Sequence, residues 1–250
     1  MLEQTKLAIL ADIHGNAWAL DAVLTDLDQR QVDAIVNLGD TLLGPLDPQR
    51  TYDLLQNRDM IHISGNQDRI LWESLEDHTL STHAPSILKE ITPKQISWLQ
   101  SLPATNIWRD SILLCHGTPF SDETYLVEEI RKDGSVGTRS SEELESSLAS
   151  IHYSVLLCGH SHIPCTVMLP SGKLIVNPGS VGLPAYTDES PVPHAMESCS
   201  PHAKYAILTH QARGWSVEHI EVPYDWDRAA RAASQHGRDD WAKWLKTGRV

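Results

Sequence analysis

Five short polar motifs in this 250-residue chain combine side chains that bind divalent metal ions. Carboxylate, carboxamide and imidazole groups suit ions such as Mn, Fe, Zn or Ni better than Ca. Together the motifs hold two Asp, one Asn and four His, too many for one ion with an open position, so they predict two ions that share a carboxylate. The motifs are Asp12-Ile13-His14, Gly39-Asp40, Gly65-Asn66, His116-Gly117 and Gly159-His160-Ser161-His162.

Each motif alone is weak evidence, because Asp-x-His and Gly-Asp mostly occur in turns and surface loops. His160 and His162 form a stronger signal, since side chains one residue apart lie on the same face of an extended backbone. The joint pattern carries the prediction, because every motif directly follows an apolar segment typical of a buried strand. Those segments are 6–11, 32–38, 60–64, 111–115 and 155–158.

Helices are expected between the first of these strands. Apolar residues at helical spacing predict a helix at 17–27, and an initial proline predicts another at 48–57. Repeated strand–loop–helix units predict a largely parallel sheet flanked by helices. Loops at the carboxyl ends of such strands converge on one crevice, so the five motifs are expected to meet there.

The rest of the chain predicts shorter elements. Residues 70–102 are expected to be mainly helical, with the clearest helix at 91–102, and 119–150 is expected to be helix or loop. No internal repeat or linker is visible, so one domain over 1–250 is expected, with a helical tail at 223–250. The remaining expected elements are strands at 165–169 and 173–176, a hairpin of 203–209 with 214–221, and one helix at 225–246.

Composition excludes several classes of protein. The formal net charge is −13, which argues against a nucleic-acid binder with a basic face and against docking on an anionic membrane. There is no apolar run of 18 residues, so no membrane span is expected. The four cysteines form no Cys-x-x-Cys pair and the N-terminus carries no signal-peptide pattern, so a cytoplasmic protein is expected.

The order D-x-H, G-D, G-N, H-G and G-H-x-H, followed by Asn-Pro-Gly-Ser-Val-Gly at 177–182, resembles the calcineurin-like metallophosphoesterases. It is most similar to their small bacterial and archaeal branch, which includes single-domain phosphodiesterases and some asymmetric dinucleoside-tetraphosphate hydrolases. The resemblance covers the chain from Lys6 to about Arg249. It implies an α/β fold: a four-layer αββα sandwich, with two mixed β-sheets packed face to face and helices outside.

The resemblance also implies a ligand set for two divalent ions. Mn is the expected metal, and Fe, Zn, Ni or Co are alternatives. Two ions roughly 3.5–4 Å apart lower the pKa of a bridging water, whose hydroxide attacks phosphorus in line. Asp40 would bridge the two ions, the first held also by Asp12, His14 and His162, and the second by Asn66, His116 and His160.

One departure from the family concerns the leaving group. The family often has histidine directly after Gly-Asn as a general acid, and this chain has Gln67 there. An amide donates hydrogen bonds but gives up no proton at neutral pH. Catalysis by Asp40, Asn66 and Gln67 therefore favours good leaving groups: aryl diesters, nucleotides and phosphoanhydrides. His83 or His194 could supply the proton instead.

Candidate substrate contacts are less specific. Asn66 could offer its carbonyl to a metal and its amide to a phosphate oxygen. Arg69 could bind phosphate, or be a solvated side chain on the first turn of a helix. Gly179 and Ser180 could present backbone N–H groups to an anion, or form a tight turn beside the metals. A flap over the site or a plain surface loop is expected at 186–202, and Tyr125 and Tyr186 are candidates for stacking on a base or for simple packing.

The sequence thus predicts a metal-dependent phosphoric ester hydrolase, with a phosphodiesterase favoured over a monoesterase. Its expected partner is a small phosphorylated or nucleotide substrate, and a homo-oligomer is left open. A serine/threonine-type protein phosphatase is an alternative, which Gln67 and the small size of the chain disfavour. A non-catalytic scaffold of the same fold is disfavoured because all seven expected ligands are present. A nuclease is disfavoured by the acidic charge.

Overall fold

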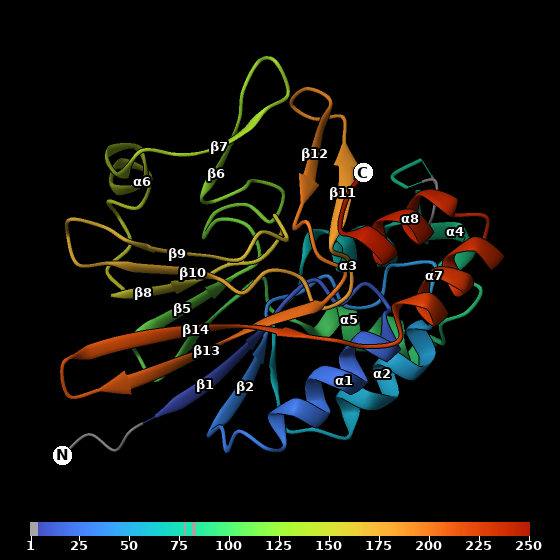
Figure 1. The fold of residues 1–250 in the computed structure, drawn as a ribbon, viewed down its shortest axis with the longest axis horizontal. Coiled ribbons are helices and arrows are strands. Elements are labelled where there is room, and N and C mark those ends of the chain that lie inside the picture. The colour runs from blue at the N-terminus through green and yellow to red at the C-terminus, as the bar shows by residue number, and fades with distance from the viewer. Residues whose placement is uncertain (1–4, 78, 82–83) are drawn as a thin grey trace.

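The computed structural model describes residues 5–77, 79–81 and 84–250, and two five-stranded sheets dominate it (Figure 1). The first sheet has the order β14-β13-β1-β2-β3. Its β1, β2 and β3 are parallel, whereas β13 runs antiparallel to β1 and to β14. The bounds are β1 Lys6–Leu10, β2 Ala34–Asn37, β3 Ile61–His62, β13 Ala203–Gln211 and β14 Gly214–Val222.

The second sheet has the order β4-β5-β8-β10-β9. Its three central strands are parallel, and the two edge strands β4 and β9 are antiparallel to their neighbours. The bounds are β4 Thr105–Trp108, β5 Ile112–Cys115, β8 Val155–Leu157, β9 Cys165–Met168 and β10 Leu174–Asn177. Two small hairpins stand apart from this sheet: β6 Glu128–Ile130 with β7 Val136–Thr138, and β11 Ala185–Asp188 with β12 His194–Glu197.

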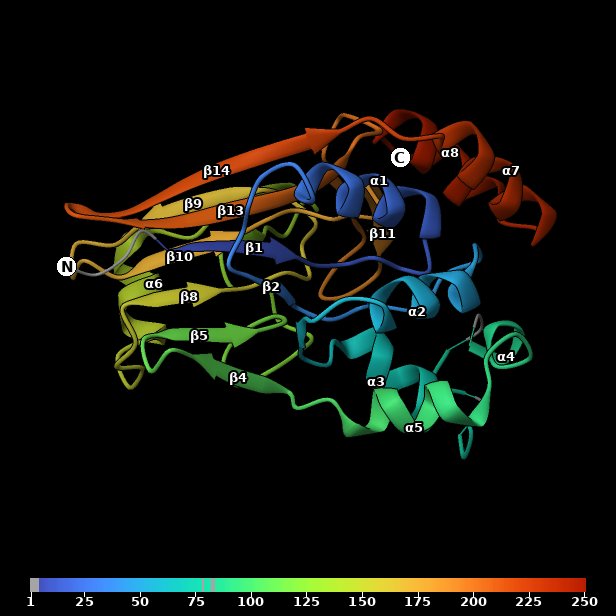
Figure 2. The same cartoon turned by 90° about the horizontal axis from the view of Figure 1, so that it is seen from below.

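Apolar side chains from both sheets meet in one buried cluster. Leu7 and Leu208 of the first sheet lie in this cluster with Leu114 and Leu157 of the second. The outer face of the first sheet packs on α1 (Ala17–Leu27), and that of the second packs on α6 (Ser141–Ser147). The expected α/β sandwich, with two mixed sheets face to face and helices outside, is therefore confirmed. Figure 2 shows β1 and β5 pointing toward the same end of the molecule.

The remaining helices gather at that end. Caps fix several of their starts: Asp47 accepts from the N–H of Arg50 at α2, and Thr92 accepts from the N–H of Gln95 at α5. Prolines at the first turn of both helices favour the same starts. The bounds are α2 Pro48–Gln56, α3 Asn66–Glu73, α4 Ala84–Ile87, α5 Pro93–Ser101, α7 Trp226–Gln235 and α8 Asp239–Thr247.

Three expected segments differ in the structure. The single helix expected at 225–246 is two helices, because Gly237 has a φ of 73° and the chain turns there between α7 and α8. The segment 119–150 contains the β6–β7 hairpin as well as α6. The segment 186–202, expected to be a flap over the site or a plain surface loop, contains most of the β11–β12 hairpin. None of the helices among the described residues is long and apolar enough to cross a membrane.

Replacement of Leu208 by alanine tests the contact between the sheets. Leu208 is fully buried in the shared cluster, so Leu208→Ala should lower the free energy of unfolding by about 3 kcal/mol. Ile107 on the edge strand β4 is 45% exposed, and Ile107→Ala should cost less than about 1 kcal/mol. Urea unfolding measures both values, and equal losses would contradict the packing of the two sheets on each other.

Candidate metal centre

The seven side chains of the five motifs lie at the carboxyl ends of strands from both sheets. Asp12 follows β1, Asp40 follows β2, and Asn66 begins α3 after β3. The second sheet contributes His116 after β5, and His160 with His162 after β8. All seven side chains are buried, with at most 9% of each residue exposed. The convergence expected from the strand order is present, although the residues come from two sheets rather than one.

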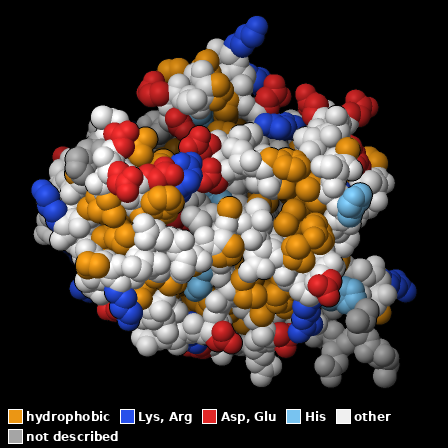
Figure 3. Space-filling view, turned by 180° about the vertical axis from the view of Figure 1, so that it is seen from behind, with side chains coloured by type: hydrophobic (Ala, Val, Ile, Leu, Met, Phe, Trp, Pro, Cys, Tyr) orange, Lys and Arg blue, Asp and Glu red, His pale blue; other side chains and the backbone are white. Residues whose placement is uncertain are grey.

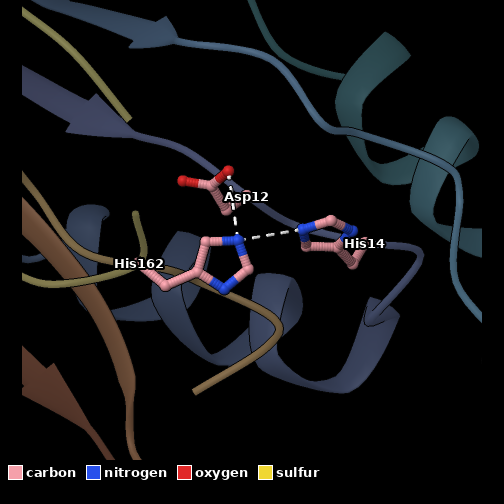
Figure 4. Close-up of side chains that lie close together, drawn as sticks. All are labelled: Asp12, His14 and His162. Atoms are coloured by element: carbon pink, nitrogen blue, oxygen red, sulfur yellow. Dashed lines mark hydrogen bonds and ion pairs between the residues drawn. The ribbon is translucent and has the colours of Figure 1, made fainter. Parts of the chain in front are cut away.

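Six of these side chains form two groups of three, and within each group the ligand atoms lie within 4.8 Å of one another. Figure 4 shows the first group, in which the imidazole of His162 turns toward both of its neighbours. Its Nε2 atom lies 3.4 Å from Asp12 Oδ1 and 3.2 Å from His14 Nε2. The groups are Asp12, His14 and His162, and Asp40, His116 and His160.

The first group presents facing ring nitrogens. His14 Nδ1 lies 3.0 Å from the carbonyl oxygen of Leu43, and His162 Nδ1 lies 2.6 Å from that of Leu183. A carbonyl oxygen only accepts, so both Nδ1 atoms carry protons and the two Nε2 atoms are the ones that face each other. Burial lowers the pKa of His14 and so favours its neutral form. Two ring nitrogens 3.2 Å apart need a proton or a metal cation between them, because two lone pairs at this distance repel.

Asp40 belongs to the second group and also lies near the first. Its Oδ2 atom is 3.8 Å from His14 Nε2 in the first group and 3.4 Å from His116 Nε2 in the second. Asn66 joins the second group, because its Oδ1 atom lies 3.0 Å from His116 Nε2. A carboxylate with one oxygen near both groups has the geometry of a bridging ligand.

The buried carboxylates create a demand for positive charge. Burial opposes ionisation of Asp40, yet the surrounding imidazoles outweigh it and hold its pKa well below the usual range. Burial also opposes protonation of His116, but Asp40 and Asp12 outweigh it and raise the pKa of His116 to about 10. Asp12 Oδ1 is buried without a hydrogen-bond partner. An orphaned carboxylate oxygen among imidazoles fits a divalent cation, which would displace the His116 proton.

The backbone is strained where these residues lie. Asp12, His14, Asp40, His160 and His162 all have φ between 50° and 69°, the left-handed region that residues other than glycine seldom adopt. Such strain persists only where the surrounding structure over-determines it, and it clusters at functional sites. Five strained residues in one place therefore support this end of the sheets as the candidate functional site.

Glycines of the motifs allow the strands to approach closely. A Cβ atom on Gly65 would lie 2.2 Å from Asp40 Oδ1, and one on Gly39 would lie 2.3 Å from the nitrogen of Gly65. No side chain fits between these two loops. The Gly-Asp and Gly-Asn motifs thus contain glycine because the loops after β2 and β3 touch.

The 177–182 loop is hydrogen-bonded to the loops that follow β1 and β8. Ser180 Oγ donates to the carbonyl oxygen of Asp12 at 2.7 Å and accepts from the N–H of Leu183. Asn177 Nδ2 donates to the carbonyl oxygen of Gly159 at 2.8 Å. Gly179 packs against Lys204 and Pro164. These contacts fit the turn expected beside the metals, and neither Gly179 nor Ser180 lines the cavity above the centre.

Asp68, Gln67 and Arg69 have distinct positions on α3. Asp68 accepts from the N–H groups of Thr41 and Gly65, and burial followed by the charge of Asp40 raises its pKa to about 6. Gln67 lines the cavity. Arg69 does not line the cavity. Its guanidinium is paired with three acids, Glu73, Asp122 and Glu123, so the predicted phosphate contact is not supported.

Tyr125 and Tyr186 contact the loop that carries His160. Tyr186 Oη donates to the carbonyl oxygen of His160 at 3.0 Å, and Tyr125 stacks on the His160 ring with centroids 4.8 Å apart. His194 Nε2 contacts Tyr125 Oη, and its Nδ1 donates to the carbonyl oxygen of Val192. Of Tyr125, Tyr186 and His194, only Tyr186 lines the cavity. His83, the other expected proton donor, lies outside the described residues.

A cavity of about 510 Å³ lies over the two groups. Besides the site residues, its wall contains residues of the α7–α8 region that the sequence analysis did not single out for function. In the sequence these residues are marked only by two tryptophans at helical spacing, a pattern that usually indicates packing. These residues are His236, Arg238, Asp240, Trp241 and Trp244.

Metal addition tests the fit directly. Mn²⁺ should raise the melting temperature of the protein, because a ligand that binds only the folded state stabilises it. At 100 times its Kd, such a ligand adds about 2.7 kcal/mol to the free energy of unfolding. His162→Ala should reduce this shift strongly, because it removes a nitrogen that faces both Asp12 and His14. The exposed His152 provides the control, since His152→Ala should keep the full shift. Equal shifts for both variants would contradict the assigned centre.

Known proteins share this architecture. The chain is 25% identical over 261 residues to an uncharacterized protein of Methanocaldococcus jannaschii, covering 95% of this chain and 96% of that protein. A metallophosphoesterase from Sphaerobacter thermophilus superposes with a TM-score of 0.75 at 22% identity, covering 98% of this chain and all of the other. A hypothetical protein from Pyrococcus horikoshii OT3 superposes with a TM-score of 0.74 at 19% identity, covering 98% of each chain.

The family match covers the residues that form the site. Residues 5–197 match the calcineurin-like phosphoesterase superfamily domain, and this range includes all seven side chains of the five motifs. Only β13, β14, α7 and α8 lie beyond it. The resemblance expected from the motifs is confirmed: the chain belongs to the calcineurin-like phosphoesterase superfamily.

Proposed function

We propose that the protein is a dinuclear metal-dependent phosphoesterase that hydrolyses phosphodiesters or nucleotide phosphoanhydrides, such as dinucleoside polyphosphates. The observation that carries the proposal is the pair of Asp/His groups, with Asp40 close to both, under one cavity. When bound, two divalent ions would supply Lewis acidity and lower the pKa of a water molecule. Mn²⁺ is the proposed metal, because carboxylate and imidazole ligands suit it.

Asn66 and Gln67 face the reacting phosphate in this proposal. Asn66 turns its Oδ1 toward His116 and lines the cavity, so its amide Nδ2 is the atom that would donate to a phosphoryl oxygen. Its place on the first turn of α3 adds the positive end of the helix dipole, which favours an anion. The N–H of Gln67 donates to Asp40 Oδ1 at 2.8 Å and so fixes the bridging carboxylate.

The absence of an acid at Gln67 determines the favoured substrates. Among the described cavity residues, the one histidine outside the two groups is His236. Both of its ring nitrogens are engaged, by the carbonyl oxygen of Ala232 and by Glu90. Without general acid catalysis, the leaving group must carry its own negative charge. Aryl and nucleotide leaving groups do so far better than alkoxides, which supports diesters and anhydrides over alkyl monoesters.

The charges on the face seen in Figure 3 indicate whether that face could bind a nucleic acid. Lys and Arg side chains on this face are separated from one another, with no continuous basic patch among the described residues. Binding of a nucleic-acid duplex depends on neutralising many phosphates along such a patch. Together with the net charge of −13, this supports a small substrate.

A hydrolysis panel with Mn²⁺ tests the proposal. The substrates are bis-p-nitrophenyl phosphate, p-nitrophenyl phosphate and diadenosine tetraphosphate, and the first or third should be cleaved fastest. Asp40→Asn should abolish turnover because it removes the bridging charge, whereas Asp59→Asn, at an exposed position, should not. Faster cleavage of the monoester would contradict the substrate class. Absence of metal-dependent turnover would favour a non-catalytic scaffold.

A second variant tests the role of Gln67. Gln67→His places an imidazole in the cavity where the leaving group departs. General acid catalysis contributes about 10² to 10⁴-fold, so hydrolysis of alkyl phosphate esters should rise at least about tenfold. Aryl diesters should change little, because their leaving groups need no proton. Gln67→Asn is the matched control, and an equal gain for both variants would rule out proton donation as the cause.

A further inference from the structure

We propose that the α7–α8 region is a recognition site for a flat aromatic substituent, a nucleobase or aryl ring, on a substrate with a single phosphoryl group. The inference rests on the proposed function and narrows its substrate class. It concerns residues beyond 197, which lie outside the superfamily match but line the cavity over the centre. Figure 1 shows α7 and α8 together beside β11, at the same end as α3.

Trp241 connects the tail to the centre. Its ring meets the His14 ring edge-on, with centroids 5.9 Å apart. Gly44 permits this approach: a Cβ atom there would lie 2.0 Å from the carbonyl oxygen of His14 and 3.2 Å from the Trp241 ring. The distance between the aromatic wall and the centre is therefore fixed by close packing. An aromatic group on this wall would be held at a set distance from the reacting phosphorus.

Trp244 extends the aromatic surface away from the centre. Its ring lies 6.4 Å from that of Trp241, tilted by 37°. Both tryptophans line the cavity although each is less than 9% exposed, so the surface they offer faces the cavity interior. Leu43 and Ile87 add aliphatic surface from other segments of the wall. A flat aromatic ring makes its best contacts with a wall of this kind.

The volume fits one such substituent with its phosphate. Cavities that bind small ligands have volumes of about 300–1,000 Å³, and this cavity has about 510 Å³. An ion pair between His236 Nε2 and Glu90 Oε1, 3.0 Å apart, connects the end of α7 to the segment after α4. The tail is thus attached across the cavity to the α4 side. A cavity of this size suits a nucleotide better than an extended peptide.

The charges of the wall argue for one phosphoryl group. Arg238 is the only Lys or Arg among the described residues that line the cavity. Its guanidinium is already paired with both oxygens of Asp240, at 2.8 and 2.6 Å, and lies over the Trp241 ring. Asp188 adds a further acid to the wall. A chain of phosphates extending from the centre would meet acids there without a free cation, so dinucleoside polyphosphates are disfavoured.

Calorimetric binding with Mn²⁺ tests the site on a matched ligand pair. Adenosine 5′-monophosphate and ribose 5-phosphate differ only in the base, so the ratio of their Kd values reports the contact of the base. The wild-type protein should bind the nucleotide at least about tenfold more tightly. Trp244→Ala should reduce this ratio at least about fivefold, and Trp244→Phe should retain most of it because a flat ring remains.

Trp226→Ala is the control for general damage to the tail. Trp226 lies on α7 but outside the cavity, against His202 and Tyr224, so its loss should leave the ratio unchanged. An equal ratio in wild type and Trp244→Ala would overturn the aromatic site. Faster cleavage of diadenosine tetraphosphate than of bis-p-nitrophenyl phosphate would overturn the single-phosphate requirement. Base-dependent binding without any hydrolysis would support the site while contradicting the proposed function.

Discussion

The rest of this structure depends on compensating the negative charge of two buried carboxylates. Asp12 and Asp40 are at most 2% exposed, and each faces imidazoles rather than lysine or arginine. Burial of an ionised carboxylate costs several kcal/mol unless a cation compensates it. His116 compensates through protonation, as its raised pKa indicates, and a divalent ion would compensate more completely. The folded arrangement of these carboxylates therefore favours the binding of cations.

The two-sheet architecture makes that burial possible. Parallel strands of both sheets end at the same place, so loops from distant parts of the sequence supply charged side chains to one small volume. The price is left-handed backbone at five positions and contact between the loops at Gly39 and Gly65. Only a rigid support can maintain such geometry, and the shared apolar cluster between the sheets provides it.

The sequence predicted the strands and the convergence of the motifs because both follow from short-range patterns and one rule of sheet topology. It could not predict that Arg69 binds Asp122, since that pair joins residues 53 positions apart and no local pattern encodes it. The break at Gly237 does have a local signal, because glycine often ends a helix, but the apolar spacing of 225–246 favoured one continuous helix. The cavity wall at Trp241 depends on its contact with His14, which lies at the other end of the chain.

Under the proposed function, chemistry and selectivity occupy different parts of this chain. The two Asp/His groups lie within the superfamily match, on strand ends that tolerate little change because glycine contacts and backbone strain fix them. The wall over them comes in part from two helices that pack through their own apolar faces and contact the centre mainly through Trp241. Residues on such a wall can change the bound substituent without disturbing the ligands of the ions. In the proposed function, a common centre can thus serve different phosphate esters, with the tail rather than the centre determining which ester binds.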